Sequence, residues 1–517
     1  MTFVAIALPL VVYCAGLLLW RILRHSLLRK QTCVLDLKQL GSSRNDNQKI
    51  HGTAVICGGS FAGLFAARVC HDHFNDVVIV EPEAWANDPE AKCQDAWNQA
   101  KPRSRVMQYK SLQGPIQSFA FKALCNLFPD LAKECELSDV NVGPSDFRSS
   151  TWGRWTKKPY NQYNGTLPDT MTAGRPGLET LMRRMVLGDR YKNIRQVIGT
   201  VTGVSRDASN SRRLDHVMIR TAGGTQEIKA AIVVDCTGPA SAGLKWLQQK
   251  VKIAYNQMVT YSTSTFHVPP ELGNRLPGLP ASYEKCSLIY ICVTDPELDC
   301  RGIQIQRVEG NYNLLWGFRP ERPSPNASKR SKVFELLDML EEAEDTMTCS
   351  HLPFSGASYI RYDKAINLPA NWIAIGDSIM KVNPLFGQGV AKALLGAICL
   401  NTLLQKYNAT SAVPNDFSTK FFEMQKNKIS PLWDADKNWD YGYHSTVPIP
   451  GETLSDGWLS RWYTRQLIIL SFDDLQAGSA LWHVNMMLAP PLDALEPGII
   501  LKVVWCAFKR SVARFLL

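Results

Sequence analysis

The sequence lacks any pair of cysteines in a C-x-x-C spacing, although fourteen cysteines are spread from Cys14 to Cys506. Zinc-ligand spacing is also absent, so no metal site is expected. A long chain with scattered cysteines is typical of reduced thiols in the cytosol, and this excludes a small disulfide-stapled scaffold. The 34 glycines and 29 prolines have no fixed period, which excludes a collagen-like sequence.

The positive charge lacks clustering. There are 57 lysines and arginines against 47 aspartates and glutamates, a net charge of +10, and they are scattered without a recognition motif. Because clustered rather than total charge attracts nucleic acid, no nucleic-acid partner is expected. With 45% hydrophobic residues the chain is neither wholly disordered nor a polytopic membrane protein, and its 517 residues predict two to four structural units.

One segment has no charge at all. Residues 1–20 are uncharged, and Arg21, Arg24, Arg29 and Lys30 follow directly. A cleavable signal peptide would carry its positive charge before the apolar stretch, and a buried helix of a soluble body is less usual at this place. About 20 apolar residues are enough to cross the roughly 30 Å of hydrocarbon in a bilayer. The segment therefore predicts a single-pass membrane anchor, with the basic side and the catalytic body facing the cytosol.

Beyond the anchor, polar residues 39–49 predict a linker, and a β-turn-α-β unit follows. Residues 53–57 and 77–80 are apolar runs typical of buried strands, with a helical pattern over 62–73 between them. The same patterns predict strands at about 194–205, 214–221, 225–230, 231–235, 257–267, 286–294, 301–308, 312–318 and 372–375. Helices are predicted at 176–187, 331–344 and 388–405, and residues 411–517 are expected to be mostly helical or irregular.

A glycine-rich turn joins the first strand of this unit to its helix. Gly58, Gly59, Ser60 and Gly63 fit G-x-G-x-x-G with serine at the middle glycine, and Glu81 ends the second strand. Small residues allow a tight turn and close approach to a pyrophosphate, which the free N–H groups of the helix N-terminus bind. An acid at the second strand end accepts hydrogen bonds from an adenosine ribose. The unit predicts dinucleotide binding; the alternative is an ordinary glycine turn.

Two more glycine-containing turns follow predicted strands. The first has Asp235 and Gly238 in the run VVDCTG, and the second is GDSIMKVNPLFGQG, which begins at Gly376 and contains Asp377. A carboxylate at a strand end accepts a hydrogen bond from a sugar-like hydroxyl, and the final glycine turn directs a helix N-terminus at an electron-rich group. Each turn alone is unspecific, since an Asp-capped helix start has the same pattern.

In this order, with a β-meander before the second, the three motifs resemble those of FAD-dependent monooxygenases of the aromatic-hydroxylase-like class, to which squalene epoxidase-like enzymes are similar. The resemblance covers about residues 50–410. It implies an α/β fold with a discontinuous Rossmann-like FAD-binding domain, an antiparallel-sheet substrate domain and a helical C-terminal region. It also implies FAD as the cofactor, NAD(P)H or a membrane-bound reductase as the electron donor, and molecular oxygen and a small apolar molecule as substrates.

The resemblance assigns cofactor contacts by position. The pyrophosphate would lie on Gly58, Gly59, Ser60 and Gly63, the adenosine ribose on Glu81, and the ribityl or pyrophosphate region on Asp377. The isoalloxazine ring would lie on Pro384, Gly387, Gln388 and Gly389, and the set is completed by Asp235, Gly238, Arg103 and Gln108. For the basic segment 103–108 a solvated loop is the alternative, and Arg175 would either touch the cofactor or support packing.

Two features depart from the family or stand outside it. The halogenase motif W-x-W-x-I-P is absent, and the run Trp152 to Trp155 only superficially resembles it, which disfavours halogenation. Asp434, Asp436 and Asp440, with His444 nearby, suggest metal or acid–base chemistry, but the run is predicted as a polar helix face with aromatic packing.

The sequence thus predicts a membrane-anchored FAD monooxygenase that hydroxylates or epoxidises an aromatic, polyketide or terpenoid metabolite through a flavin hydroperoxide. One alternative is a flavin-dependent reductase or dehydrogenase of the geranylgeranyl-reductase type, and another is a non-catalytic, membrane-tethered flavin- or isoprenoid-binding protein. The predicted organisation is an anchor (1–30), a linker (31–50), the FAD-binding domain in two parts (51–250 and 351–410), a substrate domain (251–350) and a helical C-terminal region (411–517).

Overall fold

The computed structural model describes most of the chain. The described residues are 2–106, 109–111, 117–151, 154–276, 282–285, 289–293, 302–320, 341–407 and 412–516. Several predictions therefore lie wholly or partly outside them. These are Gln108, the residues 152–153, the strands predicted at 286–294 and 301–308, and the helix predicted over 331–344, of which only a 3₁₀ turn over Glu341–Thr346 is described.

A parallel sheet of five strands forms the centre of the fold, in the order β19-β11-β1-β2-β7. Its strands are β1 (Ile50–Cys57), β2 (Phe74–Glu81), β7 (Ile194–Ile198), β11 (Ile232–Asp235) and β19 (Trp372–Ala374). All four pairings are parallel. Strands β11 and β19 and the second halves of β1 and β2 are buried and mostly apolar, as expected where helices cover a parallel sheet, whereas β7 at one edge is only partly buried. The continuous apolar runs in the sequence correspond to these buried segments.

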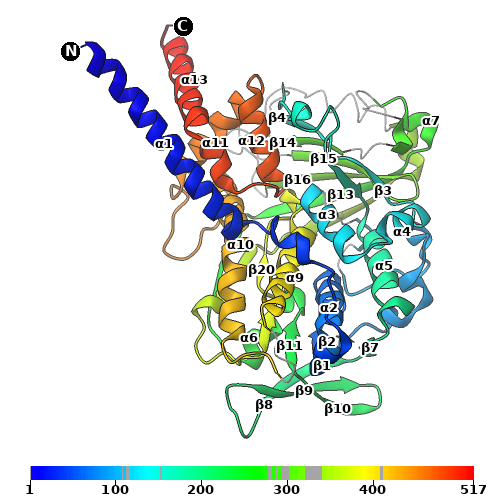
Figure 1. Ribbon diagram of the computed structural model, residues 1–517. Coiled ribbons are helices and arrows are strands. Elements are labelled where there is room, and N and C mark those ends of the chain that lie inside the picture. The colour runs from blue at the N-terminus through cyan, green and yellow to red at the C-terminus, as the bar shows by residue number, and fades with distance from the viewer. Residues whose placement is uncertain are drawn as a thin grey trace.

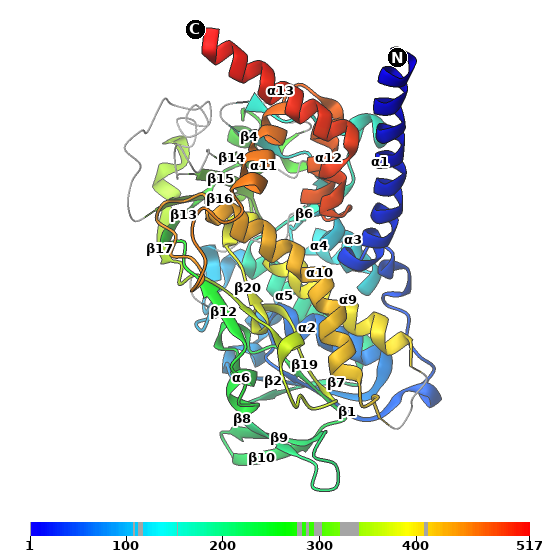
Figure 2. The same cartoon turned by 90° about the vertical axis from the view of Figure 1, so that its left-hand side faces the viewer.

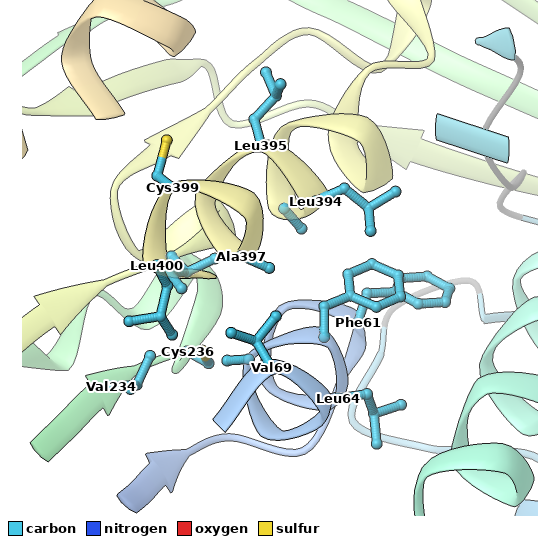
Figure 3. Close-up of a cluster of buried hydrophobic side chains, with 14 of the residues drawn as sticks. Phe61, Leu64, Val69, Val234, Cys236, Leu394, Leu395, Ala397, Cys399 and Leu400 are labelled. Carbon is cyan, nitrogen blue, oxygen red and sulfur yellow. The ribbon is translucent and has the colours of Figure 1, made fainter. Parts of the chain in front are cut away.

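Two helices pack closely against each other beside this sheet. Helix α2 (Phe61–His73) connects β1 to β2, and α9 (Gly389–Gln405) lies against it. Figure 3 shows Phe61 and Val69 of α2 facing Leu394 and Ala397 of α9, and all four are buried. Because the two helices are locked together by apolar packing, their N-terminal ends are held in a fixed relation.

Four further sheets accompany the central one in the described part of the chain. A meander consists of β8 (Thr200–Arg206), β9 (Leu214–Thr221) and β10 (Gly224–Lys229), and a small sheet of β12 (Lys252–Tyr255), β18 (Ala357–Ile360) and β20 (Met380–Lys381). A seven-stranded sheet has the order β17 (Thr348–Pro353), β13 (Val259–His267), β16 (Tyr312–Pro320), β15 (Gly302–Arg307), β14 (Ile289–Val293), β4 (Arg148–Thr151) and β5 (Arg154–Trp155). Its pairings are antiparallel except for β14 with β4. A last pair is β3 (Asn141–Pro144) with β6 (Asp169–Thr172).

Helices make up much of the rest of the described chain. The C-terminal region contains α10 (Phe417–Asp440), α11 (Trp458–Leu470), α12 (Leu475–Asn485) and α13 (Pro497–Leu516). The others are α3 (Ser118–Leu127), α4 (Leu131–Leu137), α5 (Arg175–Val186), α6 (Ala242–Trp246) and α7 (Pro270–Gly273). Figures 1 and 2 place α11, α12 and α13 at the end of the molecule opposite the β8–β10 meander.

The N-terminal helix α1 (Thr2–Gln31) projects from the body at that same end (Figure 1). Val11, Val12, Leu18 and Leu19 are each more than half exposed along it. By length and composition α1 is a candidate membrane span. An N-terminal signal sequence can meet the same two criteria.

The segment predicted as a linker, 39–49, is held against the body rather than free. Arg44 Nε donates to His73 Nδ1 at 3.1 Å, and Arg44 Nη2 donates to the carbonyl oxygens of Leu404 and Tyr407 at the end of α9. Leu40 is buried in the main core. The polar residues of this segment predicted a linker. In the structure one of them, Arg44, instead caps the C-terminal end of α9.

Candidate functional site

The three predicted glycine turns meet at one edge of the parallel sheet. A Cβ atom at Gly58 would lie 2.3 Å from the carbonyl oxygen of Cys236, and one at Gly376 would lie 2.7 Å from Cβ of Ala62. Gly238 N donates to Ser378 Oγ at 2.9 Å. Carboxyl ends of parallel strands face the same edge, so motifs far apart in sequence form a single candidate site there.

The first turn is a narrow backbone cradle. Gly58 has φ +116°, and a Cβ at Gly63 would lie only 1.8 Å from the carbonyl oxygen of Gly58. Ser60 is at the N-cap of α2 but makes no side-chain capping bond. The first N–H groups of α2 therefore lack a side-chain acceptor at their own helix end, which is the arrangement that binds anionic groups.

Glu81 lies directly beneath this cradle and is almost fully buried. Its Oε2 accepts from Gly59 N at 2.8 Å, and its Oε1 accepts from Glu83 N at 3.0 Å. Arg103 Nη2 pairs with the same carboxylate at 3.0 Å. Two predicted residues, Glu81 and Arg103, are thus in contact with each other, and Glu81 also bonds to the cradle.

Arg103 belongs to a buried network of charges that extends along α5. Glu179 pairs with Arg103, with Arg175 at 2.7 Å and with Arg183 at 3.2 Å. Burial alone would raise the pKa of Glu179, but the three guanidinium groups lower it to about 2. Burial would lower the pKa of Arg103, and Glu179 and Glu81 raise it. The network holds the segment around Arg103 against α5 instead of leaving it solvated.

Two arginines of this network reach the cradle. Arg183 Nη2 donates to the carbonyl oxygen of Gly59 at 2.6 Å. Arg175 Nη2 donates to Ser60 Oγ at 2.7 Å, and its guanidinium carbon lies 4.4 Å from the ring centroid of Phe61. Glu179 and Arg183 were not predicted as site residues. Their spacing from Arg175, four and eight positions along one helix, is the signal that could have found them.

Both carboxylate oxygens of Asp235 accept hydrogen bonds from the turn that follows it. Asp235 is fully buried, its Oδ1 accepts from the backbone and hydroxyl of Thr237 at 2.9 and 2.7 Å, and its Oδ2 accepts from Gly243 N at 3.0 Å. Burial raises its pKa despite these bonds. Asp235 thus holds the turn, whereas Gly238, where a Cβ would meet no described atom within 4 Å, faces open space.

Asp377 is more accessible than Asp235. Its side chain is 41% exposed, and its Oδ1 pairs at 2.5 Å with Nζ of Lys392, a lysine of α9 that is buried. Lys392 also donates to the carbonyl oxygen of Met380. The pair ties the start of the third motif to α9 and leaves the carboxylate at the surface of the candidate site.

The turn before α9 contains unpaired buried polar atoms. Asn383 Oδ1 accepts from Leu385 N at 3.0 Å, and Gly387 closes the turn with φ +61°. Oε1 of Gln388 and Oε1 of Gln117 are both buried without a hydrogen-bond partner among the described residues. Gln117 Nε2 donates to the carbonyl oxygen of Phe386, so both amides lie at this turn. Buried acceptors without donors are costly, and a ligand donor would satisfy them.

The acidic run of α10 corrects one prediction. Asp436 and Asp440 are buried rather than on a polar helix face. Asp440 accepts from Gln257 Nε2 at 2.6 Å, Tyr255 OH at 2.9 Å and Asn383 Nδ2 at 2.7 Å. Residues four apart share one helix face, and here that face is turned inward onto β12 and the chain after it.

Comparisons with known proteins agree with this geometry. No protein-family model matches the chain. Protein Rv3254 of Mycobacterium tuberculosis is 24% identical over 479 residues, covering 83% of this chain and 91% of that protein. Among solved structures, the flavin-dependent brominase Bmp2 has a TM-score of 0.54 at 14% identity, covering 89% of this chain and 100% of that one.

Two further solved structures are similar. A flavoprotein/dehydrogenase from Cytophaga hutchinsonii has a TM-score of 0.57 at 11% identity and covers 89% of this chain and 100% of that one. The p-nitrophenol 4-monooxygenase PnpA from Pseudomonas putida has a TM-score of 0.51 at 14% identity and covers 85% and 99%. The chain has the fold of the FAD-dependent, aromatic-hydroxylase-like flavoproteins. The resemblance read from its three motifs is therefore confirmed at the level of the fold.

Proposed function

We propose that the chain is an FAD-dependent monooxygenase that hydroxylates or epoxidises an apolar small-molecule metabolite. The observation that carries the proposal is the meeting of three glycine turns, from distant parts of the chain, at one edge of a parallel sheet. A flavin-dependent brominase and a p-nitrophenol monooxygenase share the fold, and the halogenase motif is absent from this sequence, which together favour oxygen insertion over halogenation.

The residues at the site fit FAD. The cradle of Gly58 and Gly63 has no room for a Cβ atom, as the close approach of a turn to a diphosphate requires, and Arg175 lies beside it at Ser60. Gln388 and Gln117 have unpaired amide oxygens at the turn before α9, and these would accept hydrogen bonds from N–H groups of a bound flavin. Bound FAD would supply the activation of oxygen by a reduced flavin.

The protein itself would stabilise the negative charge that develops on a reduced flavin. The N-terminus of α9, which has no side-chain cap at Gln388, would stabilise negative charge on a reduced ring. We assign FAD to residues 51–250 and 351–410, and the substrate to the space between the flavin and the seven-stranded sheet, of which β13 to β16 lie within 251–350. NAD(P)H, or a membrane-bound reductase, would provide electrons, and α1 would attach the enzyme to a membrane with its body in the cytosol.

One test uses the open space at Gly389. A Cβ there meets no described atom within 4 Å, so Gly389→Val should leave the protein folded but occupy space that the flavin needs. We expect the purified wild type to be yellow and Gly389→Val to lose at least about 90% of its flavin, a shift of more than about 1.4 kcal/mol in binding. Gly223→Val, on the turn between β9 and β10, is the control and should keep its flavin.

The reaction class is tested with labelled dioxygen. The wild-type enzyme, supplied with NAD(P)H and candidate apolar substrates, should transfer one labelled oxygen atom to its product. The similarity to a flavoprotein/dehydrogenase favours one competing function, a flavin-dependent reductase or dehydrogenase. Turnover without label in the product would support that function instead, and a colourless protein would reject both.

A further inference from the structure

Helix α13 has one buried face and one exposed apolar face. Ile499 and Val503 are fully buried and pack with Leu467 of α11 and Ala477 of α12. On the other side the exposed fractions run from 40% to 59% for five large apolar residues: Leu501, Val504, Trp505, Phe508 and Val512. A contiguous apolar face of this kind marks an interaction site in a folded protein.

The charge on α13 is of one sign. Residues 497–517 contain no acid and four bases, namely Lys502, Lys509, Arg510 and Arg514. Nζ of Lys509 lies 5.1 Å from the ring centroid of Trp505, and the rings of Trp505 and Phe508 are stacked 5.9 Å apart. Basic and aromatic side chains beside an apolar face are typical of helices that lie in the interface of an anionic membrane.

The start of α13 is fixed against α1. Trp20 Nε1 donates to the carbonyl oxygen of Leu492 at 3.1 Å, and Arg24 forms two bonds of 2.7 and 2.8 Å to Asp493, just before α13 begins. Further along, a Cβ at Gly498 would lie 3.4 Å from Tyr13 OH. Helix α13 therefore begins beside the uncharged part of α1, and Figure 2 shows it running across the top of the molecule, away from α1.

We propose that α13 is a second membrane-binding element, which lies in the interface of an anionic phospholipid bilayer. Trp505 and Phe508 enter the acyl region, and Lys509 and Arg510 remain at the headgroups. A bilayer is favoured over a protein partner because a membrane that holds the uncharged part of α1 must reach the start of α13. The proposal rests on the proposed attachment of α1 to the membrane and adds a second contact to it.

The test uses the full chain and flotation with vesicles of phosphatidylcholine and phosphatidylserine. In a background that weakens α1 (Val12→Glu with Leu19→Glu, both at exposed positions), the chain should still float with anionic vesicles and be released by high salt. Adding Trp505→Glu and Phe508→Glu should reduce flotation more than about tenfold. Adding Ile366→Glu, which is 72% exposed elsewhere on the body, should leave it unchanged.

The outcomes separate the two contacts. If the α13 substitutions leave flotation unchanged in the weakened background, the proposal is wrong. The proposal is also wrong if the α13 substitutions leave flotation unchanged but abolish self-association measured by light scattering. In that case the exposed face of α13 would join two copies of the chain. If Val12→Glu with Leu19→Glu has no effect when α13 is also substituted, the attachment of α1 fails. Flavin content is measured in every variant, so the proposed activity is judged separately.

Discussion

At the scale of single residues, the two buried carboxyl groups of α10 are the least expected feature. Neither oxygen of Asp436 has a hydrogen-bond partner among the described residues, whereas Asp440 has three donors. Burial raises the pKa of Asp440 to about 7, and burial together with the neighbouring Asp440 raises the pKa of Asp436 well above its ordinary value. Through Asn383 the pair is connected to the turn before α9.

These pKa values predict a pH dependence of stability. A carboxyl whose pKa is higher in the folded state stabilises the fold while protonated, and this contribution is lost as the pH rises to about 7. Asp436→Asn removes the cost of ionising an unpaired buried group, so its Tm should exceed that of the wild type by about 2 °C or more at pH 8. The difference should shrink as the pH falls toward 5.

Thermal unfolding of both proteins across pH 5–8 measures this effect. Glu423→Gln, an exposed position on the same helix, is the control and should show no difference from the wild type at any pH. An increase in Tm of the same size at every pH would mean that ionisation of Asp436 is not its cause.

The sequence predicted the residues of the site unevenly. Gly58, Gly63 and Glu81 could be predicted because the backbone geometry of a strand-turn-helix unit depends on neighbours in sequence. The inward position of Asp436 and Asp440 could not, since carboxylates four apart occur equally on solvated helix faces. The donors to Asp440 come from distant parts of the chain: Tyr255 and Gln257, some 180 positions earlier, and Asn383.

At the scale of elements, the segment 39–49 is fixed mainly through Arg44. Its guanidinium donates to His73 and to the carbonyl oxygens of Leu404 and Tyr407. Burial lowers the pKa of His73 to about 4, so this imidazole is a neutral acceptor at physiological pH. The segment is therefore an extension of the packing around α9.

Replacing Arg44 should release this segment. Arg44→Ala removes the guanidinium donor from the carbonyl oxygen of Tyr407 and from that of Leu404, which also accepts from Tyr407 N at 3.2 Å. The loss costs about 1–3 kcal/mol and should expose residues 39–49 to a non-specific protease. Lys38→Ala, an exposed neighbour, is the matched control. Limited proteolysis followed by mass spectrometry locates the cleavage. Equal resistance of Arg44→Ala and the wild type would show that other contacts suffice to hold the segment.

The elements themselves were largely predictable, whereas their pairing was not. Apolar runs and turn residues located β1, β2 and β11 within a few positions. Nothing local indicates that β19, from the far part of the chain, lies beside β11 in the same sheet. That pairing depends on the packing of α9 against α2, which brings the third motif to the first.

At the scale of the whole molecule, we expect α1 to decide whether the protein associates with membranes. Its exposed apolar side chains predict that the full chain stays with membranes after high salt and alkaline carbonate and is released by detergent. Leu18→Arg with Leu19→Arg should move much of the protein into the carbonate supernatant. Fractionation with immunoblotting measures this, and wild-type protein in the salt supernatant would contradict the attachment of α1.

The fixed segment 39–49 sets the orientation of the body relative to α1, and this orientation bears on electron transfer to the proposed flavin. With Arg44 fixing that segment and Arg24 fixing α1 to Asp493, the body cannot swivel about its attachment as it would on a flexible tether. With FAD bound and α1 in a membrane, as proposed, the height and tilt of the flavin edge above the lipid surface would then be constant. A reductase that diffuses in the same membrane would meet that edge by a two-dimensional search, in one approach direction, and its own dimensions would decide whether the electron transfer distance is short enough.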